Sequence, residues 1–285
     1  MIRIGLTGFS DHPILQSSAT KASAKLLDYS GHFPIVEIDS AFYAIPRKEV
    51  VERWVEDTPH TFQFIVKAYQ AMTGHQRKED WTFTSIEEIF RTFEASISPM
   101  QEAGKLFAVL FQFPPWYDCV PKNKAYIKKI RTRLAHLPIA IEFRNQTWFS
   151  AKNEQATLAF LQEQSLIHVI CDEPQVGAGS VPFVPKATHH KVMFRLHGRN
   201  VHGWRNIGNA EHWRKVRFLY NYNEDELQQF INEIRKFEDH HDIAVTFNNN
   251  SAHDAAPNAK KLQQLLAIKY EGLAPRQLDF FKGDW

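Results

Sequence analysis

The sequence contains few cysteines and no long uninterrupted hydrophobic run. Its 285 residues include two cysteines, Cys119 and Cys171, which is too few for a disulfide framework or for a zinc site built from paired thiolates. No stretch approaches the roughly 20 apolar residues of a membrane-spanning helix, and the amino-terminal segment MIRIGLTGFS lacks the features of a secretion signal. We therefore expect a reducing, cytoplasmic location and no membrane association.

A strong net charge is also missing. The formal net charge is +2, with 34 basic and 32 acidic residues, so bulk charge gives no sign of an obligate polyanion binder, although a local basic segment can still bind one. Hydrophobic residues make up 44% of the chain and charged residues 23%, which is typical of a soluble globular protein and excludes a disordered chain. Aromatic residues are plentiful, with 22 Phe and 7 Trp, so that some are available to line a ligand site.

Short apolar segments rich in Val, Ile and Phe alternate with longer amphipathic segments. Strands are expected over residues 2–7, 34–39, 62–67, 106–112, 139–144, 166–172, 191–197 and 242–248. Helices are expected over residues 20–29, 47–56, 84–100, 122–134, 153–164, 223–239 and 256–269. This alternation predicts one (β/α)8 TIM barrel over residues 1–285. The alternative is an open doubly wound sheet, which the absence of a glycine-rich nucleotide-binding motif after any strand disfavours.

Two segments between the expected strands have specific signatures. Asn223 precedes the acidic sequence EDEL, an arrangement typical of a helix start. The connection between segments 166–172 and 191–197 is rich in proline and glycine and has no helical periodicity. It therefore predicts an irregular loop after strand six in place of a helix.

Polar residues end seven of the eight expected strands. Because alternate residues of a barrel strand face the interior, the polar ends can share one inner face: Glu37 with Asp39, Lys67, Gln112, Glu142 with Arg144, Asp172, Arg195 with His197, and Asn248. TIM-barrel enzymes build their active sites at this end of the strands. The sequence therefore predicts a common pocket. Internal salt bridges are the alternative for any single residue, but burying many charges is costly unless all are paired.

The predicted pocket mixes charges of both signs. The planar guanidinium groups of Arg144 and Arg195 suit a bound phosphate or carboxylate. For catalysis, Glu37 or Glu142 is the expected general base and His197 the general acid, with Lys67 beside them. A divalent metal is a possible cofactor of such carboxylates and histidine, but the interleaved cations compete with it.

Aromatic and amide residues follow several strands. Tyr43 and Trp148, with Phe42 and Trp116, either form a stacking wall for a base or sugar or simply cap the core. Asn248 and Asn249 are placed to grip an anion or a hydroxyl.

The segment 195–218 is the most basic part of the chain. It carries Arg199, Arg205, Arg214, Lys215 and Arg217 interleaved with Trp204 and Trp213. Such a pattern suits a phosphate backbone with stacked bases, whereas the alternative interpretation is a solvated loop that covers the pocket.

Six motifs in order resemble the YecE-like family, also called domain of unknown function 72: VEIDSAFYAIP, FQFIVKA, VLFQFPPWY, IEFRNQTWF, RLHGRN and FNNNSAHDAAPNA. The resemblance implies a TIM barrel with its site at the carboxyl ends of the strands, and it implies no established reaction. The recurrent positions of the family are Glu37, Lys67, Gln112, Glu142, Arg144, Arg195, His197 and Asn249. The chain departs from the family pattern at Asp39, Ala41 and the His75 region.

Three functions follow from these observations. The first is binding of a phosphate-containing ligand, with nucleic acid favoured, at the barrel mouth by Arg144, Arg195 and the basic segment. The second, which rests on the similarity of the family's barrel to endonuclease IV and the xylose isomerases, is metal-assisted hydrolysis or lysis of a phosphodiester or phosphosugar. The third is a non-catalytic scaffold for a protein partner.

Overall fold

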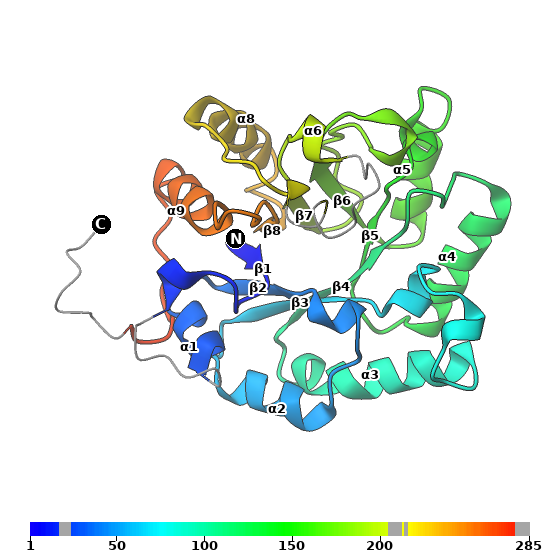
Figure 1. The fold of residues 1–285 in the computed structure, drawn as a ribbon, viewed down its shortest axis with the longest axis horizontal. Coiled ribbons are helices and arrows are strands. Elements are labelled where there is room, and N and C mark those ends of the chain that lie inside the picture. Colours follow the sequence, from blue (N-terminus) through cyan, green and yellow to red (C-terminus); the bar gives the residue numbers. More distant parts are fainter. Residues whose placement is uncertain (17–23, 205–212, 214–215, 277–285) are drawn as a thin grey trace.

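Eight parallel strands form a closed barrel in sequential order (Figure 1). A computed structural model describes residues 1–16, 24–204, 213 and 216–276. The strands are β1 (Ile2–Thr7), β2 (Ile35–Ile38), β3 (Gln63–Lys67), β4 (Leu106–Gln112), β5 (Ile139–Glu142), β6 (Ile167–Asp172), β7 (Lys191–Leu196) and β8 (Asp242–Phe247). Because β8 pairs with β1, the sheet has no open edge. The predicted (β/α)8 barrel is confirmed, and the alternative open sheet is wrong.

Helices surround the barrel (Figure 1). The described ones are α1 (Lys25–Ser30), α2 (Lys48–Glu56), α3 (Ile86–Glu102), α4 (Pro121–Arg133), α5 (Glu154–Glu163), α6 (Val201–Trp204), α8 (Glu224–Arg235) and α9 (Ala255–Leu265). The first part of the expected helix 20–29 lies outside the described residues. The connection between β6 and β7 contains only the short turn η7 (Gly177–Gly179), as its composition predicts. None of these helices has the length and apolar character needed to cross a bilayer.

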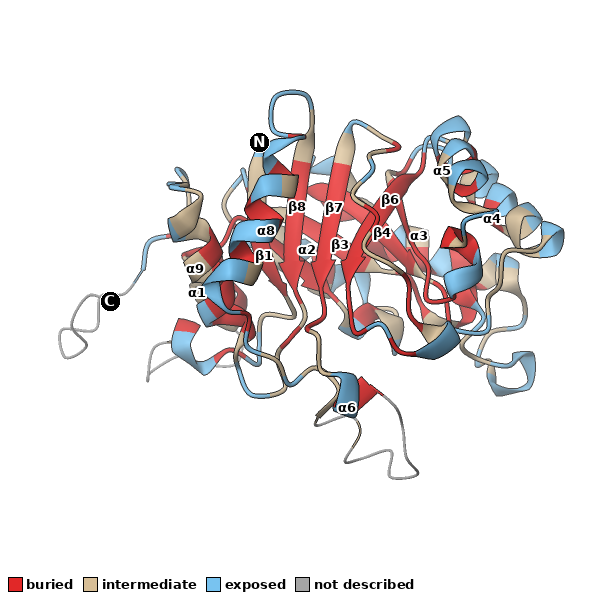
Figure 2. Cartoon of the chain, turned by 90° about the horizontal axis from the view of Figure 1, so that it is seen from above, coloured by how far each residue is buried: buried red, intermediate tan, exposed pale blue. Residues whose placement is uncertain are grey.

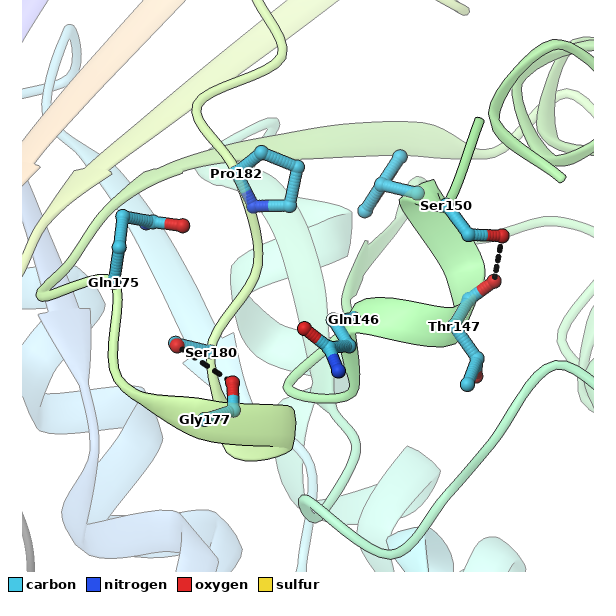
Figure 3. A pocket seen from close by; sticks show the side chains of 8 residues that line it. Gln146, Thr147, Ser150, Gln175, Gly177, Ser180 and Pro182 are labelled. Atoms are coloured by element: carbon cyan, nitrogen blue, oxygen red, sulfur yellow. Dashed lines mark hydrogen bonds between the residues drawn. The ribbon is translucent and has the colours of Figure 1, made fainter. Parts of the chain in front are cut away.

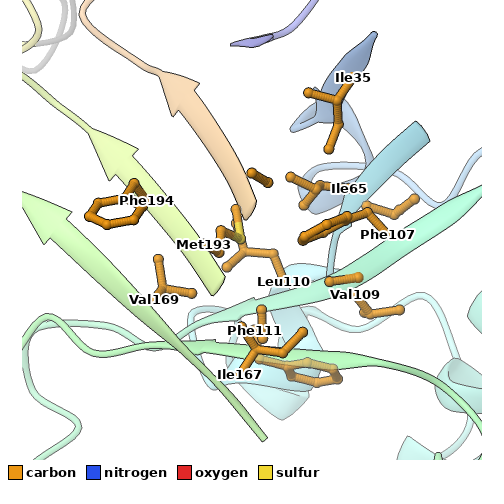
Figure 4. Close-up of a cluster of buried hydrophobic side chains, with 14 of the residues drawn as sticks. Ile35, Ile65, Phe107, Val109, Leu110, Phe111, Ile167, Val169, Met193 and Phe194 are labelled. Carbon is orange, nitrogen blue, oxygen red and sulfur yellow. The ribbon is translucent and has the colours of Figure 1, made fainter. Parts of the chain in front are cut away.

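The barrel interior changes from apolar to charged along the strand direction. At mid-height the inward residues include Ile35, Ile65 and Met193, all fully buried (Figure 4). Two positions further along β2, β3 and β7, the same face carries Glu37, Lys67 and Arg195, because side chains on one face recur every second residue. The apolar layer is thus the floor on which the charged residues stand.

Short elements extend beyond the carboxyl ends of the strands. The turns η3 (Ser40–Phe42), η4 (Gln70–Thr73) and η6 (Gln146–Phe149) follow β2, β3 and β5. Helix α6 follows β7 and projects past the carboxyl ends of the strands (Figure 2). The strands themselves are buried along most of their length (Figure 2). These segments hold the aromatic residues that surround the charged end of the barrel.

Helix α8 begins with a capping box, which confirms the predicted start. The Asn223 side chain accepts from the Glu226 backbone N–H at 2.9 Å, and the Glu226 carboxylate accepts from the Asn223 N–H at 3.0 Å. We expect Asn223→Ala to lower the free energy of unfolding by about 1 kcal/mol, because the helix loses an acceptor for its first turn. Urea unfolding measures the change. Asn223→Asp should stay close to the wild type, and an equal loss in both variants would refute the capping role.

Candidate functional site

Arg195 joins four strands at the carboxyl end of the barrel. From β7 it reaches Glu37 on β2, donating from Nε to Oε2 at 2.8 Å and from Nη2 to Oε1 at 2.5 Å. Its Nη1 donates to Glu142 on β5 and to Gln112 Oε1 on β4, the latter at 3.3 Å. Glu37 and Glu142 are 0% exposed. The guanidinium therefore sits inside a fully desolvated polar network, where each donor must find an acceptor.

Arg144 continues this network from the end of β5. Its Nε donates to Glu142 Oε1 at 2.5 Å, and its Nη1 donates to Glu173 in the loop after β6. Its Nη2 lies 2.9 Å from His197 Nε2. Arg144 and Arg195 are thus both paired with carboxylates. Together with Glu37, Glu142 and Glu173 they form one buried charged network.

His197 is held as a neutral imidazole. Arginine can only donate, so His197 accepts from Arg144 at Nε2, and its Nδ1 faces the side-chain amide of Asn248 at 2.9 Å. Burial, Arg144 and Arg195 together lower the pKa of His197 well below its usual value. A neutral ring whose Nε2 is occupied has no proton to deliver there, so this arrangement does not favour the expected role as general acid.

The two buried carboxylates Glu142 and Glu173 differ in pKa. Burial alone would raise the pKa of Glu142, but the opposing effect of Arg144 and Arg195 is larger, so that its pKa lies well below the ordinary value. Glu173 is different, because burial dominates over Arg144 and raises its pKa to about 7. Glu142 is therefore a fixed anion of the site and a poor base, whereas Glu173 titrates near neutrality.

The predicted inward orientation of Asp172 is wrong. In the β6–β7 register Cys171 pairs with Arg195 and Asp172 pairs with Leu196, so the inward face of β6 runs through Cys171 to Glu173. Asp172 faces outward and accepts hydrogen bonds from Arg199 Nε and from Tyr222 Oη, at 2.9 and 2.7 Å.

Three other expected ligand-binding residues are committed elsewhere. Arg199 pairs with Asp172 and with Glu226 on α8. Asn249 donates to the Tyr220 carbonyl and to Asn258. Trp148 is buried and stacks on Phe143 with ring centroids 3.9 Å apart, and its Nε1 donates to the Tyr117 carbonyl. These side chains stabilise the loops around the site, and Trp148 belongs to the core.

Lys67 and Asp39 lie beside the network without joining it. Ile38 pairs with Val66 across β2 and β3, and the next residues along the chain are Asp39 and Lys67. Among the described residues, neither side chain forms an ion pair or a hydrogen bond to another residue; Lys67 Nζ lies 4.4 Å from the centre of the Phe42 ring. Burial and Arg195 lower the pKa of Lys67 to about 8, whereas burial and Glu37 raise that of Asp39.

Arg217 supplies a second unpaired cation. Its guanidinium carbon lies 4.6 Å from the ring centres of Trp204 and Trp213 and 5.0 Å from that of Phe218. Its Nε is buried without a hydrogen-bond partner, and among the described residues the guanidinium makes no ion pair. Burial and Arg144 lower its pKa. Of the basic segment, Arg205, Arg214 and Lys215 lie outside the described residues.

Exposed aromatic rings adjoin these cations. The His75 ring packs edge-on against Phe42 and Trp116, with centroids 4.9 and 5.9 Å away. Burial, Lys67, Arg144 and Arg217 lower the pKa of His75 to about 4, which places these three cations within electrostatic range of one neutral ring. Tyr43 is 70% exposed and Trp116 67% exposed, so their faces are available to a ligand.

The sequence comparison identifies the relatives of this chain. The profile described as "Protein of unknown function DUF72" matches residues 3–279. The chain belongs to the DUF72 family. It is 50% identical over 283 residues to UPF0759 protein YunF of Bacillus subtilis, covering 99% of this chain and 100% of that protein. It is 27% identical over 180 residues to YecE of Escherichia coli, covering 62% of this chain and 61% of that protein.

Solved structures of other DUF72 members share the barrel. The crystal structure of a DUF72 family protein from Enterococcus faecalis has 41% identity and a TM-score of 0.90, with 98% of this chain and 100% of that chain covered. The DUF72 family protein from Thermotoga maritima has 28% identity and a TM-score of 0.80, with 94% and 100% covered. The resemblance read from the six motifs is thereby confirmed.

The ligand atoms of this DUF72 barrel do not suit a metal. Within the described part of the chain one group of potential ligands lies close together: Glu142, Cys171 and His197. Both Glu142 oxygens already accept from arginines, and His197 Nε2 accepts from Arg144. A cation placed there would face two guanidinium groups at hydrogen-bonding distance, which disfavours it.

A separate cavity of about 440 Å³ lies between η6 and the loop after β6 (Figure 3). Its walls are formed by Gln146, Thr147, Phe149, Ser150, Gln175, Gly177, Ser180 and Pro182. The hydroxyls of Ser150 and Ser180 already donate to the carbonyls of Thr147 and Gly177. The lining of this cavity carries no charged side chain, and both serine hydroxyls already form hydrogen bonds within it. In this it differs from the charged end of the barrel.

We expect Glu142→Gln to lower the free energy of unfolding by about 3 kcal/mol, because it leaves two buried guanidinium groups short of a counterion. Chemical unfolding of both proteins measures this. The matched control is Glu233→Gln, which removes the surface pair with Lys236 and should cost less than about 1 kcal/mol. Equal losses in the two variants would show that the buried network is not held by charge.

The difference between wild type and Glu142→Gln should depend on pH. Since the folded state depresses the pKa of Glu142 below its ordinary value, the carboxylate contributes its full stability above the pKa that it has in the unfolded chain. The contribution is lost as pH falls toward the folded pKa, where both states are protonated. Unfolding measured at about pH 7 and about pH 3 should therefore give a smaller difference at the acidic pH. A difference that grows in acid would contradict the assignment.

Proposed function

We propose that this DUF72 protein binds a phosphate-containing ligand at the carboxyl end of its barrel. The supporting observation is the division of its cations into two groups. Arg144 and Arg195 are paired with buried carboxylates, whereas Lys67 and Arg217 have no carboxylate partner among the described residues. The two unpaired cations, and not the two predicted arginines, are the groups with donors to spare for an anion.

A half-buried cation without a counterion is costly, because it has lost part of its hydration and gained no opposite charge. The Arg217 Nε is buried and has no hydrogen-bond acceptor, and a bound phosphate would supply both the acceptor and the opposite charge. Guanidinium forks bind phosphate in a bidentate manner. The site is therefore completed by an anion.

The exposed rings of Tyr43 and Trp116 provide the second element of recognition. Rings of this kind stack on bases and on the apolar faces of sugars. With two unpaired cations within the described residues, the geometry suits one phosphate group attached to a sugar or a base. A nucleic-acid strand would engage further cations of segment 195–218, and the salt dependence of binding distinguishes the two.

We expect Arg217→Ala to weaken binding of ribose 5-phosphate or AMP about 10-fold or more, since a charge-assisted hydrogen bond contributes roughly 1.5–3 kcal/mol. Isothermal titration calorimetry measures the affinity. Arg235→Ala, in the last turn of α8, is the control and should bind as the wild type does. Wild-type affinity in Arg217→Ala, or no binding of any phosphate compound, would refute the proposal.

The same titration with a single-stranded oligonucleotide reports the number of phosphates engaged. One phosphate group held at the site predicts a slope of about −0.7 for log affinity against log salt, at roughly −0.7 per neutralised phosphate. A slope near −3.5 would mean that about five phosphates are held, as the interleaved basic segment would provide. A slope near zero would exclude phosphate contacts altogether.

A further inference from the structure

We propose that the Lys67 amine is a nucleophile that forms an imine with an aldehyde or ketone group of the bound ligand. The inference rests on the proposed function, because Arg217 would hold the ligand's phosphate while Lys67 reacts with its carbonyl carbon. The substrate class is then a phosphorylated sugar in its open-chain form.

The lack of partners distinguishes Lys67 from other lysines with partly or fully buried amines. Lys105 donates to the carbonyls of Val55 and Thr58, Lys191 donates to that of Phe107, and Lys260 to that of His32. Within the described part of the chain, the Lys67 amine forms no hydrogen bond or ion pair, and it lies 4.4 Å from the centre of the Phe42 ring. An amine whose lone pair and protons are uncommitted is free to attack, whereas the other three are held as structural donors.

The surroundings of Lys67 favour the neutral, nucleophilic amine. Burial and the nearby charge of Arg195 oppose the ammonium form, against Glu37, Glu142 and Asp39, and its pKa falls to about 8. At pH 7 roughly one such amine in ten is unprotonated, compared with a few in ten thousand for an exposed lysine. Lysines activated in this way form Schiff bases with carbonyl compounds.

Asp39 is placed to carry the proton of the reaction: its carboxylate takes a proton from the Lys67 ammonium, which frees the Nζ lone pair, and returns it in the later step. Asp39 directly follows Ile38, which pairs with Val66 beside Lys67. Within the described residues its side chain forms no hydrogen bond to another residue, and burial with Glu37 raises its pKa. The Nζ lone pair forms a bond to the carbonyl carbon, and the C=O π pair moves to oxygen. A proton passes from nitrogen to that oxygen and gives the carbinolamine. The Asp39 carboxyl then protonates the hydroxyl, water leaves, and the iminium remains beside the new Asp39 carboxylate.

Reductive trapping tests the inference. The protein is incubated with glyceraldehyde 3-phosphate and sodium cyanoborohydride, and the modified residue is located by peptide mass spectrometry. We expect one adduct per chain, on Lys67, formed at least about 10-fold faster than on lysines of ordinary pKa, in line with the difference in neutral amine. The rate should rise with pH up to about 8 and then level, because the amine loses its proton there. Adducts spread over many lysines would overturn the proposal.

Lys260 is an internal control for reactivity that comes from pKa alone. Burial and Arg276 lower its pKa to about 8 as well, but its amine donates to the His32 carbonyl and lies outside the charged network. If Lys260 is modified as fast as Lys67, the location of Lys67 has no special role and the inference fails.

Variants separate this inference from the proposed function. Lys67→Arg keeps the positive charge but has no amine, so it should give no trapped adduct. Asp39→Asn should trap about 100-fold more slowly than the wild type, the lower end of the usual range for loss of a general acid. Phosphate binding by the wild type without an adduct would refute the imine alone. Trapping on Lys67 that is equally fast with unphosphorylated glyceraldehyde would support the imine and refute the phosphate site.

Discussion

The buried Arg195 guanidinium is the interaction on which the carboxyl end of the barrel depends. A guanidinium cannot lose its proton, so its burial requires fixed acceptors on every side. Glu37 and Glu142 supply them from β2 and β5, and both strands must keep their positions for the contacts to persist. The requirement ties opposite sides of the barrel together directly above the apolar layer.

The pairing of Arg195 with carboxylates also determines which side chains of the site are left without an ion-pair partner. Glu142 is shared between Arg195 and Arg144, and Arg144 in turn needs Glu173. Glu37, Glu142 and Glu173 are engaged in these pairs, so that within the described residues Lys67 lies near several charges and forms an ion pair with none of them. Because the low-dielectric surroundings strengthen every interaction between charges, the same charged groups that stabilise this end of the barrel also shift the pKa of the Lys67 amine.

The sequence alone predicts the barrel and much of the site, and its failures have identifiable causes. Alternation of strand and helix patterns predicts all eight strands, and two-residue parity correctly brings Glu37, Glu142 and Arg195 together. Parity fails at β6, because a strand that is buried on both faces shows no alternation from which to choose the inward side. The polar residue at the strand end, Asp172, is therefore predicted to face inward, whereas the inward face continues from Cys171 to Glu173, two positions further along.

The partners of each charge lie beyond the reach of sequence reasoning. The contacts that commit Arg195 to Glu37 join residues 158 positions apart, and no local pattern encodes them. Arg144 and Arg217 are the same residue type in the sequence, yet Arg144 is paired with two carboxylates, whereas Arg217 packs against the rings of Trp204 and Trp213 and forms no ion pair within the described residues. A charged residue at a strand end thus predicts a site, but only the pairing reveals which charge is free to act on a ligand.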